Sequence, residues 1–497
     1  MFLRAGSFHI LYEKGFLRQI KQDDLEIIRM MYFALRDHNW GTFSYVIENE
    51  VIENHQNHFW ITYTLLHLDE SSYPIFAWEV KIEGKADNTI VFEIAGKALQ
   101  DVLKNRAGFC ILHPIEGTAQ QPVTIFHGDS SQSDTHFPRF IAAQDPFLNI
   151  KSMRWQVANG ISYQLDFEGD IFQTEDQRNW GDASYKTFCT PLSLPFPVQL
   201  YQGDTVWQRV SLSQMATPSP TVIPPISFTK SFKPSLFSMG IAVSIESDSL
   251  PATAIDLLKS LALSHYRIDI NSFQENWITT FSQHCETASV LDLPLEIALT
   301  LNDQYDTQLQ SFVFLCEQNK LNIRYLILFS SQSLTTPQTI IDYVPFLKQQ
   351  LPKVKIGVGT DYNFTELNRQ RFQAGEADFI SFSYHPQVHA FDDLSLMENT
   401  ETLRYQIESA TNLYHKPVHI SFISLHKRAN PYATNIADVS VSIEKQIDSR
   451  QKTTFGAAWL KAVLRSLSQT EVASVTIFRT HWRVGYFVNR RYSLSRF

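Results

Sequence analysis

Residues 295–301 (LEIALTL), 307–318 (TQLQSFVFLCEQ) and 324–329 (RYLILF) form an apolar run, an amphipathic stretch and a second apolar run. The two runs are too continuous for strands with one solvated face, and the middle stretch has its apolar side chains at helical spacing. A strand, a helix and a second strand in this order predict a parallel sheet covered by helices.

The same alternation extends over the second half of the chain. We predict further strands at residues 240–245, 266–270, 355–359, 379–384, 418–423 and 474–478, and further helices at residues 252–263, 339–350, 400–414 and 456–468. Eight such units over roughly 240 residues fit a closed (β/α)₈ TIM barrel, which we assign to residues 237–484. An open doubly wound sheet fits less well, because residues 245–249 (IESDS) replace the Gly-rich phosphate loop after the first strand.

The first half of the chain has a different pattern. Residues 59–65 (FWITYTL), 89–94 (TIVFEI) and 161–167 (ISYQLDF) alternate between β-branched or aromatic and polar side chains. This alternation predicts an antiparallel β-sandwich domain over residues 1–213. Residues 24–36 are open to either a helix or a strand. The Pro-rich residues 214–236 are expected to be an extended connector.

The overall composition excludes several classes of protein. The chain has 497 residues, 44% of them hydrophobic, and 42 basic against 51 acidic side chains give a net charge of −9. This charge gives no electrostatic reason to bind nucleic acid or anionic lipid. No apolar run is long enough for a membrane span, the N-terminus lacks a signal-peptide pattern, and the four cysteines lack CxxC spacing. We therefore expect a cytoplasmic protein with reduced thiols; its oligomeric state is not predicted.

In a TIM barrel the active site lies where the carboxyl ends of the strands meet, so polar residues at these ends are the first candidates. The predicted second, fifth, sixth and seventh strands supply Arg267, Asp269, Asp361, Asn363, Glu366, Asn368, His385, Gln387, His389, Lys427 and Arg428.

Each of these groups also has a plainer interpretation. Arg267 and Asp269 can form a structural ion pair, and Asp361 or Asn363 can cap a helix. Histidine moves protons near neutral pH, but the two histidines and two acids of residues 385–393 can also bind a divalent metal, a reading that we do not favour because their spacing matches no metal motif. The Lys427–Arg428 pair can attract a carboxylate or an oxyanion, or can simply be solvated.

One segment of the β domain differs from its neighbours. Residues 175–186 (EDQRNWGDASYK) mix aromatic side chains with carboxylates, amides and cations. Apolar ring faces beside many hydrogen-bonding groups favour sugar recognition, and an interdomain interface is the alternative. The candidate binding residues of this segment are Asp176, Arg178, Trp180, Asp182 and Lys186.

The sequence contains no GxSxG, Walker, dinucleotide-binding or HExxH motif, and nothing in it calls for an organic cofactor. Several of its strings together resemble the D-apionate lactonase family. These strings are residues 36–42 (RDHNWGT), 105–114 (NRAGFCILHP), 175–192 (EDQRNWGDASYKTFCTPL), 364–369 (FTELNR), 385–393 (HPQVHAFDD) and 455–459 (FGAAW).

The resemblance implies an N-terminal β domain, a TIM barrel and a small C-terminal domain. It also implies hydrolysis of D-apionolactone to D-apionate in the breakdown of the branched pentose apiose. At residues 478–485 (FRTHWRVG) the chain departs from the family's Gly-Trp-Arg-Gly-like turn. We expect the basic residues 485–497 to be a remnant of the C-terminal domain.

Opening a sugar-acid lactone requires a base for water, donors for the oxyanion and an acid for the leaving alkoxide. We expect His385 or His389 to move protons, with Asp361 or Glu366 as the partner. Lys427, Arg428 or Asn363 would stabilise the oxyanion, and Arg178, Trp180 and Asp182 would hold the sugar. The alternatives are a glycoside hydrolase, with Asp361 or Glu366 paired with Asp269 or Asp303, and a non-catalytic sugar-binding protein.

Overall fold

The computed structural model describes residues 1–157, 160–215, 237–243, 252–432 and 446–480. The chain divides into two compact units: Met1–Gln177 with Ser184–Lys230, here the N-terminal unit, and Arg178–Ala183 with Ser231–Phe497, here the barrel unit. Six residues that precede strand β15 of the N-terminal unit therefore belong to the barrel unit. Nearly all of the predicted connector, and the whole predicted basic tail, lie outside the described residues.

The N-terminal unit is a 17-stranded antiparallel sheet. Its strands are β1 (Phe2–Ala5), β2 (Phe8–Glu13), β3 (Phe16–Gln22), β4 (Leu25–Asp37), β5 (Ser44–Asn54), β6 (Phe59–Leu68), β7 (Pro74–Lys85), β8 (Thr89–Ala98), β9 (Val102–Pro114), β10 (Pro122–His127), β11 (Gln132–His136), β12 (Phe147–Gln156), β13 (Ser162–Glu168), β14 (Phe172–Asp176), β15 (Ser184–Phe188), β16 (Val198–Leu200) and β17 (Thr205–Gln214).

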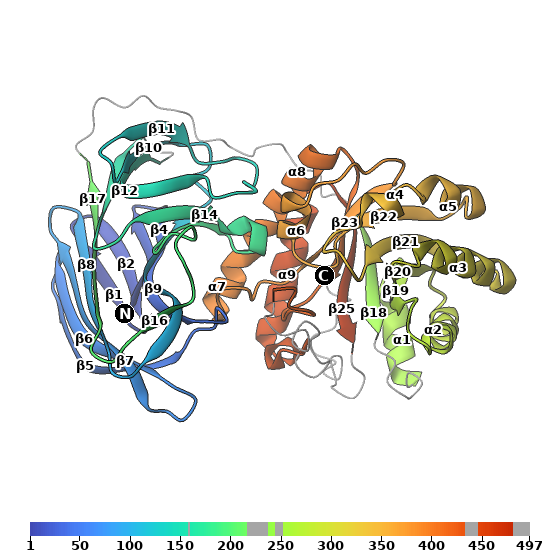
Figure 1. Cartoon of the computed structure of the whole chain (residues 1–497), viewed down its shortest axis with the longest axis horizontal. Helices are drawn as coiled ribbons and strands as arrows, with labels where there is room; N and C mark the ends of the chain where they lie inside the picture. The colour runs from blue at the N-terminus through green and yellow to red at the C-terminus, as the bar shows by residue number, and fades with distance from the viewer. Residues whose placement is uncertain (158–159, 216–236, 244–251, 433–445, 481–497) are drawn as a thin grey trace. The chain divides into compact units, whose positions relative to one another are not determined.

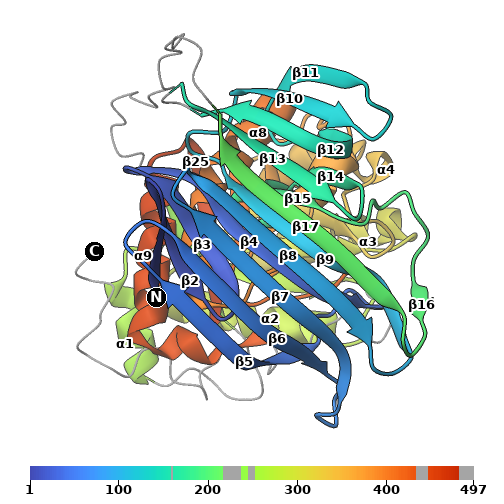
Figure 2. The same cartoon turned by 90° about the vertical axis from the view of Figure 1, so that its left-hand side faces the viewer.

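Two rows of strands make up most of this sheet; β10 and β11 add to it beside β12, and β16 beside β9. One row runs from β5 through β6, β7, β8, β17 and β13 to β12, and its long strands lie side by side in Figure 2. The other runs from β1 through β2, β3, β4, β9 and β15 to β14, which also pairs with β12. The large antiparallel domain is thus confirmed. The predicted sandwich is not, because hydrogen bonds join both rows into one continuous sheet.

Side-chain alternation explains how these strands form a core. Along β6 the odd-numbered residues from Phe59 to His67 are buried, and the even-numbered residues between them are exposed or half-buried. Residues 24–36, whose pattern suits either a helix or a strand, lie almost wholly in β4 (Leu25–Asp37), whose partners are β3 and β9. Phe33 on β4 packs edge-on against Phe92 and Phe109. Pairing on both edges and burial against these rings outweigh the helical preference of the Met and Leu residues.

The barrel unit contains a closed barrel of eight parallel strands, as predicted (Figure 1). The strands are β18 (Ser238–Val243), β19 (His265–Asn271), β20 (Leu295–Leu301), β21 (Ile323–Ser330), β22 (Lys355–Gly359), β23 (Phe379–Tyr384), β24 (Val418–Ile423) and β25 (Val472–Thr480). The helices are α1 (Ala252–Ser260), α2 (Trp277–Leu291), α3 (Tyr305–Asn319), α4 (Gln338–Ile341), α5 (Val344–Gln350), α6 (Phe364–Arg369), α7 (Asp393–Glu398), η2 (Asn399–Glu401), α8 (Thr402–Tyr414), η5 (Ser449–Lys452) and α9 (Thr454–Ser468), and η1 (Gln177–Trp180) runs from the N-terminal unit into this one.

Side chains fill the amino-terminal part of the barrel. The rings of Phe379 and His419 stack with centroids 3.7 Å apart, and Tyr325 meets both rings edge-on. Gly357 leaves room for this stack, since a Cβ there would lie 2.1 Å from the Phe379 ring. A packed floor leaves the carboxyl ends of the strands as the place for a site. Among the described helices, none combines the length and apolarity needed to cross a bilayer.

Candidate active site

Four charged side chains form a closed network at the carboxyl ends of the barrel strands. Arg267 on β19 donates to Asp269 Oδ1 at 2.7 Å and to Asp361 Oδ1 at 3.0 Å. Arg428, in the loop after β24, donates to Asp269 Oδ2 at 2.9 Å and to Asp361 Oδ1 at 3.1 Å. Each cation therefore bridges both carboxylates, and the four charges balance.

A buried acid lies below this network. Glu296 on β20 accepts a hydrogen bond from Thr476 at 2.7 Å and lies 3.7 Å from Arg267. Burial raises the pKa of Glu296 to about 7, although Arg267 opposes the shift. Burial also disfavours the charge of Arg267, but Asp269, Asp361 and Glu296 outweigh it and hold its pKa above the usual value. Beside Glu296, burial lowers the pKa of His265 to about 3.

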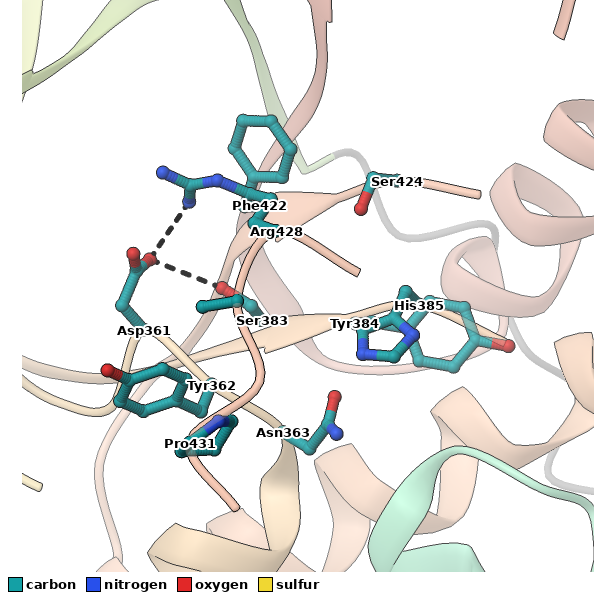
Figure 3. Close-up of a pocket in the computed structure, with 11 residues that line it drawn as sticks. Asp361, Tyr362, Asn363, Ser383, Tyr384, His385, Phe422, Ser424, Arg428 and Pro431 are labelled. Carbon is teal, nitrogen blue, oxygen red and sulfur yellow. Dashed lines mark hydrogen bonds and ion pairs between the residues drawn. The ribbon is translucent and has the colours of Figure 1, made fainter. Parts of the chain in front are cut away.

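A pocket opens beside the network (Figure 3). Asp361 at its edge accepts hydrogen bonds from Arg428 and, at 3.4 Å, from Ser383 on β23. The residues that line it are Asp361, Tyr362, Asn363, Ser383, Tyr384, His385, Phe422, Ser424, Arg428, Ala429 and Pro431. Asn363 begins α6, and its amide makes no capping hydrogen bond. This amide remains available to a ligand.

His385 lines the pocket and is held neutral. It is 9% exposed, and its Nδ1 has no hydrogen-bond partner among the described residues. Burial, together with the neighbouring His426 and Lys427, lowers its pKa to about 3. A histidine with this pKa cannot hold a proton taken from water near neutral pH, so its ring is suited to hydrogen bonding.

His389 has a different environment. Its Nδ1 lies 2.7 Å from Oδ2 of Asp182, a residue of the 178–183 segment that is 5% exposed. The other carboxylate oxygen of Asp182 accepts a hydrogen bond from Asn399 at 3.2 Å. When Nδ1 carries the ring proton, it donates to this carboxylate, and the lone pair of Nε2 points away from the pair. A base oriented by a buried carboxylate is the arrangement that nucleophile-activating triads use.

A second acid is linked to Trp180 through Tyr432. Glu366 on α6 is 1% exposed, and its Oε1 accepts a hydrogen bond from Tyr432 at 2.8 Å. Burial raises the pKa of Glu366 to about 7, against the effects of Tyr432 and Arg369. The Trp180 ring meets the rings of Tyr432 and His389 edge-on, and Arg369 lies over it. Trp180 thus contacts both His389 and Tyr432, and Tyr432 in turn donates a hydrogen bond to Glu366.

Side chains of the barrel helices hold the 178–183 segment in place. Asn368 on α6 donates to Asn179 Oδ1 at 3.0 Å, and Gln406 on α8 donates to the carbonyl of Arg178 at 2.7 Å. Arg178 is fully buried, with its guanidinium over the ring of Tyr405. These contacts hold Arg178 and Asn179, the first two residues of the segment.

The structure gathers most of the predicted site residues in the barrel unit. The side-chain amide of Gln387 links two loops of the barrel unit, since it donates to Leu425 O and to Asp448, both at 2.7 Å. Lys427 is half-buried beside His385. Asp176 and Lys186 belong to the N-terminal unit, where Asp176 accepts a hydrogen bond from Ala142 N and Lys186 forms an ion pair with Glu175.

Sequence reasoning did not identify Tyr432 or Asn399. Neither residue directly follows a predicted strand, and neither type suggests chemistry by itself. The nearest signal for Tyr432 is the polar run that begins at Lys427. In the part of the chain that the structure describes, no three His, Cys, Asp or Glu side chains are grouped so that they could hold a metal ion.

The fold and this site together define the class of protein: a TIM-barrel protein, with a large antiparallel β domain before the barrel in the chain and ionisable side chains at the carboxyl ends of the barrel strands. Residues 1–217 match the D-apionate lactonase N-terminal domain, and residues 239–492 match the D-apionate lactonase TIM barrel domain. The chain belongs to the D-apionate lactonase family. It is 28% identical over 450 residues to a D-apionate lactonase of Brucella anthropi. The alignment covers 87% of this chain and 74% of the relative.

Solved structures resemble parts of the chain only weakly. A glycoside hydrolase family 17 β-1,3-glucanosyltransferase from Rhizomucor miehei aligns with 48% of this chain and 86% of its own, at a TM-score of 0.33 and 16% identity. A galactose 1-epimerase from Lactobacillus acidophilus aligns with 43% of this chain and 92% of its own, at a TM-score of 0.27 and 7% identity.

Proposed function

We propose that this protein is a sugar-acid lactone hydrolase that opens D-apionolactone to D-apionate by attack of water on the lactone carbonyl. Membership of the D-apionate lactonase family supports a lactonase role. The observation that carries the assignment to this site is the His389–Asp182 pair, at 2.7 Å, because hydrolysis requires a base that is held in a fixed orientation.

In the proposed reaction His389 Nε2 removes a proton from water as the water oxygen bonds to the lactone carbonyl carbon. Asp182 stabilises the imidazolium that forms, through the hydrogen bond at Nδ1. The Asn363 amide in the pocket is the proposed donor to the tetrahedral oxyanion. Arg428 is a poorer donor, since its guanidinium already bridges two carboxylates.

Collapse of the tetrahedral intermediate breaks the bond between the carbonyl carbon and the ring oxygen. The departing alkoxide takes a proton that comes from Glu366, whose pKa of about 7 keeps its carboxyl group protonated in part of the molecules at neutral pH. Solvent then returns the proton from His389 to Glu366, and the new carboxyl group releases its proton to solvent to give D-apionate. Trp180, whose ring meets those of His389 and Tyr432 edge-on, is the proposed face for the apolar side of the sugar.

The test is a pH-stat assay on a panel of aldonolactones that includes D-apionolactone, with and without a chelator. We expect turnover of D-apionolactone in both conditions and a fall in kcat of about 10²-fold or more in His389→Gln, the effect of losing a general base. His415→Gln, at the end of α8, is the matched control and should keep the wild-type rate.

Each alternative predicts a different result in this assay. Release of reducing sugar from a glycoside without lactone turnover would indicate a glycoside hydrolase. Binding of D-apionate without turnover of any lactone would indicate a sugar-binding protein, and a loss of rate with the chelator would overturn the metal-free mechanism. The proposed location is the cytoplasm, where free thiols persist; Cys110, Cys189, Cys285 and Cys316 are all free.

A further inference from the structure

Asn399 lies where the 178–183 segment meets the loop after β23, and the candidate base and its carboxylate come from these two pieces of chain. It is 5% exposed and begins η2, between α7 and α8. We propose that Asn399 is a positioning residue that holds Asp182 against His389. This inference rests on the proposed function, because it assigns a role within the same site.

One amide group makes every contact that this role requires. The Asn399 Nδ2 group donates to Asp182 Oδ1 at 3.2 Å and to the carbonyl of Pro386 at 3.0 Å. Its Oδ1 accepts a hydrogen bond from the backbone N–H of Ala183 at 3.1 Å. Two donations and one acceptance use the opposite ends of the amide, so the group is fixed in one orientation.

The backbone of Asn399 adds a fourth contact. Its carbonyl accepts a hydrogen bond from the hydroxyl of Tyr384 at 2.9 Å, and Tyr384 is the last residue of β23. Asn399 therefore joins the end of a barrel strand, the loop that leads to His389 and the segment that carries Asp182. A shift of any of these parts changes the 2.7 Å separation of Asp182 and His389.

The geometry also explains why asparagine suits this position. Aspartate has nearly the same shape and can still accept the Ala183 N–H, but it has no amide protons to donate. It would instead direct a carboxylate oxygen at the Asp182 carboxylate and at the Pro386 carbonyl. Asn399→Asp thus turns the contacts with Asp182 and Pro386 from attractive to repulsive and keeps the contact with Ala183. It is therefore a more selective change than removal of the side chain.

The experiment compares three variants of the full chain with the wild type. Asn399→Asp should lower kcat for D-apionolactone about 10²-fold, the scale of effect for a displaced reacting group, with a smaller change in KM. In the exchange variant Asp182→Asn/Asn399→Asp, residue 182 can donate to residue 399. The melting temperature should return toward the wild-type value while kcat stays low, because His389 has lost its carboxylate.

Gln406→Ala is the matched structural control. Gln406 is 1% exposed and binds the same segment through Arg178 O, but it does not touch Asp182. It should lower the melting temperature with kcat within a few-fold of wild type. If Asn399→Asp keeps kcat, or if Gln406→Ala lowers kcat as strongly, Asn399 serves only to hold the segment and the inference is wrong.

A second measurement separates this inference from the proposed function. The ¹⁵N NMR shifts of the His389 ring report which nitrogen carries the proton, whether or not the enzyme turns over a lactone. We expect Asn399→Asp to change them and Gln406→Ala to leave them as in the wild type. A wild type without lactonase activity would refute the proposed function alone, and unchanged His389 shifts in Asn399→Asp would refute the positioning role alone.

Discussion

Asp182 and His389 are 207 positions apart in the chain, yet a carboxylate oxygen of one lies 2.7 Å from a ring nitrogen of the other. Asp182 comes from a six-residue segment that belongs to the barrel unit, and His389 comes from the loop after β23. This pair separates the two candidate histidines. His389 has a carboxylate partner, whereas His385 is buried with its Nδ1 unpaired among the described residues and its pKa lowered to about 3.

The first prediction concerns the carboxylate. Asp182→Asn keeps the shape of the side chain but removes the charge that stabilises the imidazolium of His389. We expect kcat for D-apionolactone to fall by about 10²-fold or more with little change in melting temperature. Asp393→Asn, whose side chain is 63% exposed beside Arg450, is the control. Equal rates for both variants and the wild type would remove Asp182 from the mechanism.

The second prediction concerns the acid. Because burial raises the pKa of Glu366 to about 7, the fraction of protonated Glu366 falls as the pH rises through 7. Tyr432, Arg369 and Tyr362 are the titratable groups that interact with this carboxyl group. We expect the kcat–pH profile to decline above about pH 7, and Glu366→Gln to have a low rate without this decline. Glu376→Gln, an exposed change, should keep the wild-type profile; a decline that persists in Glu366→Gln would assign it to another group.

The third prediction concerns stability and pH at Glu296. Its folded-state pKa of about 7 lies above the usual 4.5, so its protonated form favours the folded state. This contribution is fully present below about pH 4.5 and is lost as the pH rises through 7. The melting temperature of Glu296→Gln minus that of the wild type should therefore increase from pH 5 to pH 8. Glu317→Gln, exposed on α3, should show no such trend. A constant difference between Glu296→Gln and wild type across this range would contradict the raised pKa.

The fourth prediction concerns the charged network at the barrel mouth. Arg428 binds Asp269 and Asp361 with two different nitrogens, and its guanidinium lies over the ring of Phe422. Lysine has the charge but neither the planar fork nor the stacking face. We expect Arg428→Lys to lose nearly as much melting temperature and lactonase activity as Arg428→Gln.

Arg465→Gln on α9 is the control for this pair, because Arg465 is exposed and outside the network. If Arg428→Lys behaves as the wild type, a single positive charge is sufficient and the bridging of Asp269 and Asp361 by two guanidinium nitrogens has no role.

The sequence by itself determined the architecture of the barrel. All eight predicted strands coincide with β18 to β25 within a few residues at each end, among the described residues. Local patterns suffice here because a strand buried on both faces and an amphipathic helix each leave a continuous signature in the chain. The same logic directed attention to the carboxyl ends of the strands, where Asp361, His385 and Arg428 now line one pocket.

Only the tertiary structure decided how the N-terminal strands pair and which side chains meet. Hydrogen bonds between β12 and β14 join two rows of strands into one sheet, and β4 is a strand because of its two neighbours. Periodicity carries no information about partners, since every antiparallel strand alternates in the same way. For the same reason no local pattern could place Asp182 beside His389, Tyr432 beside Glu366 or Asn399 against Asp182. Each contact joins residues that only the folding of the whole chain brings together.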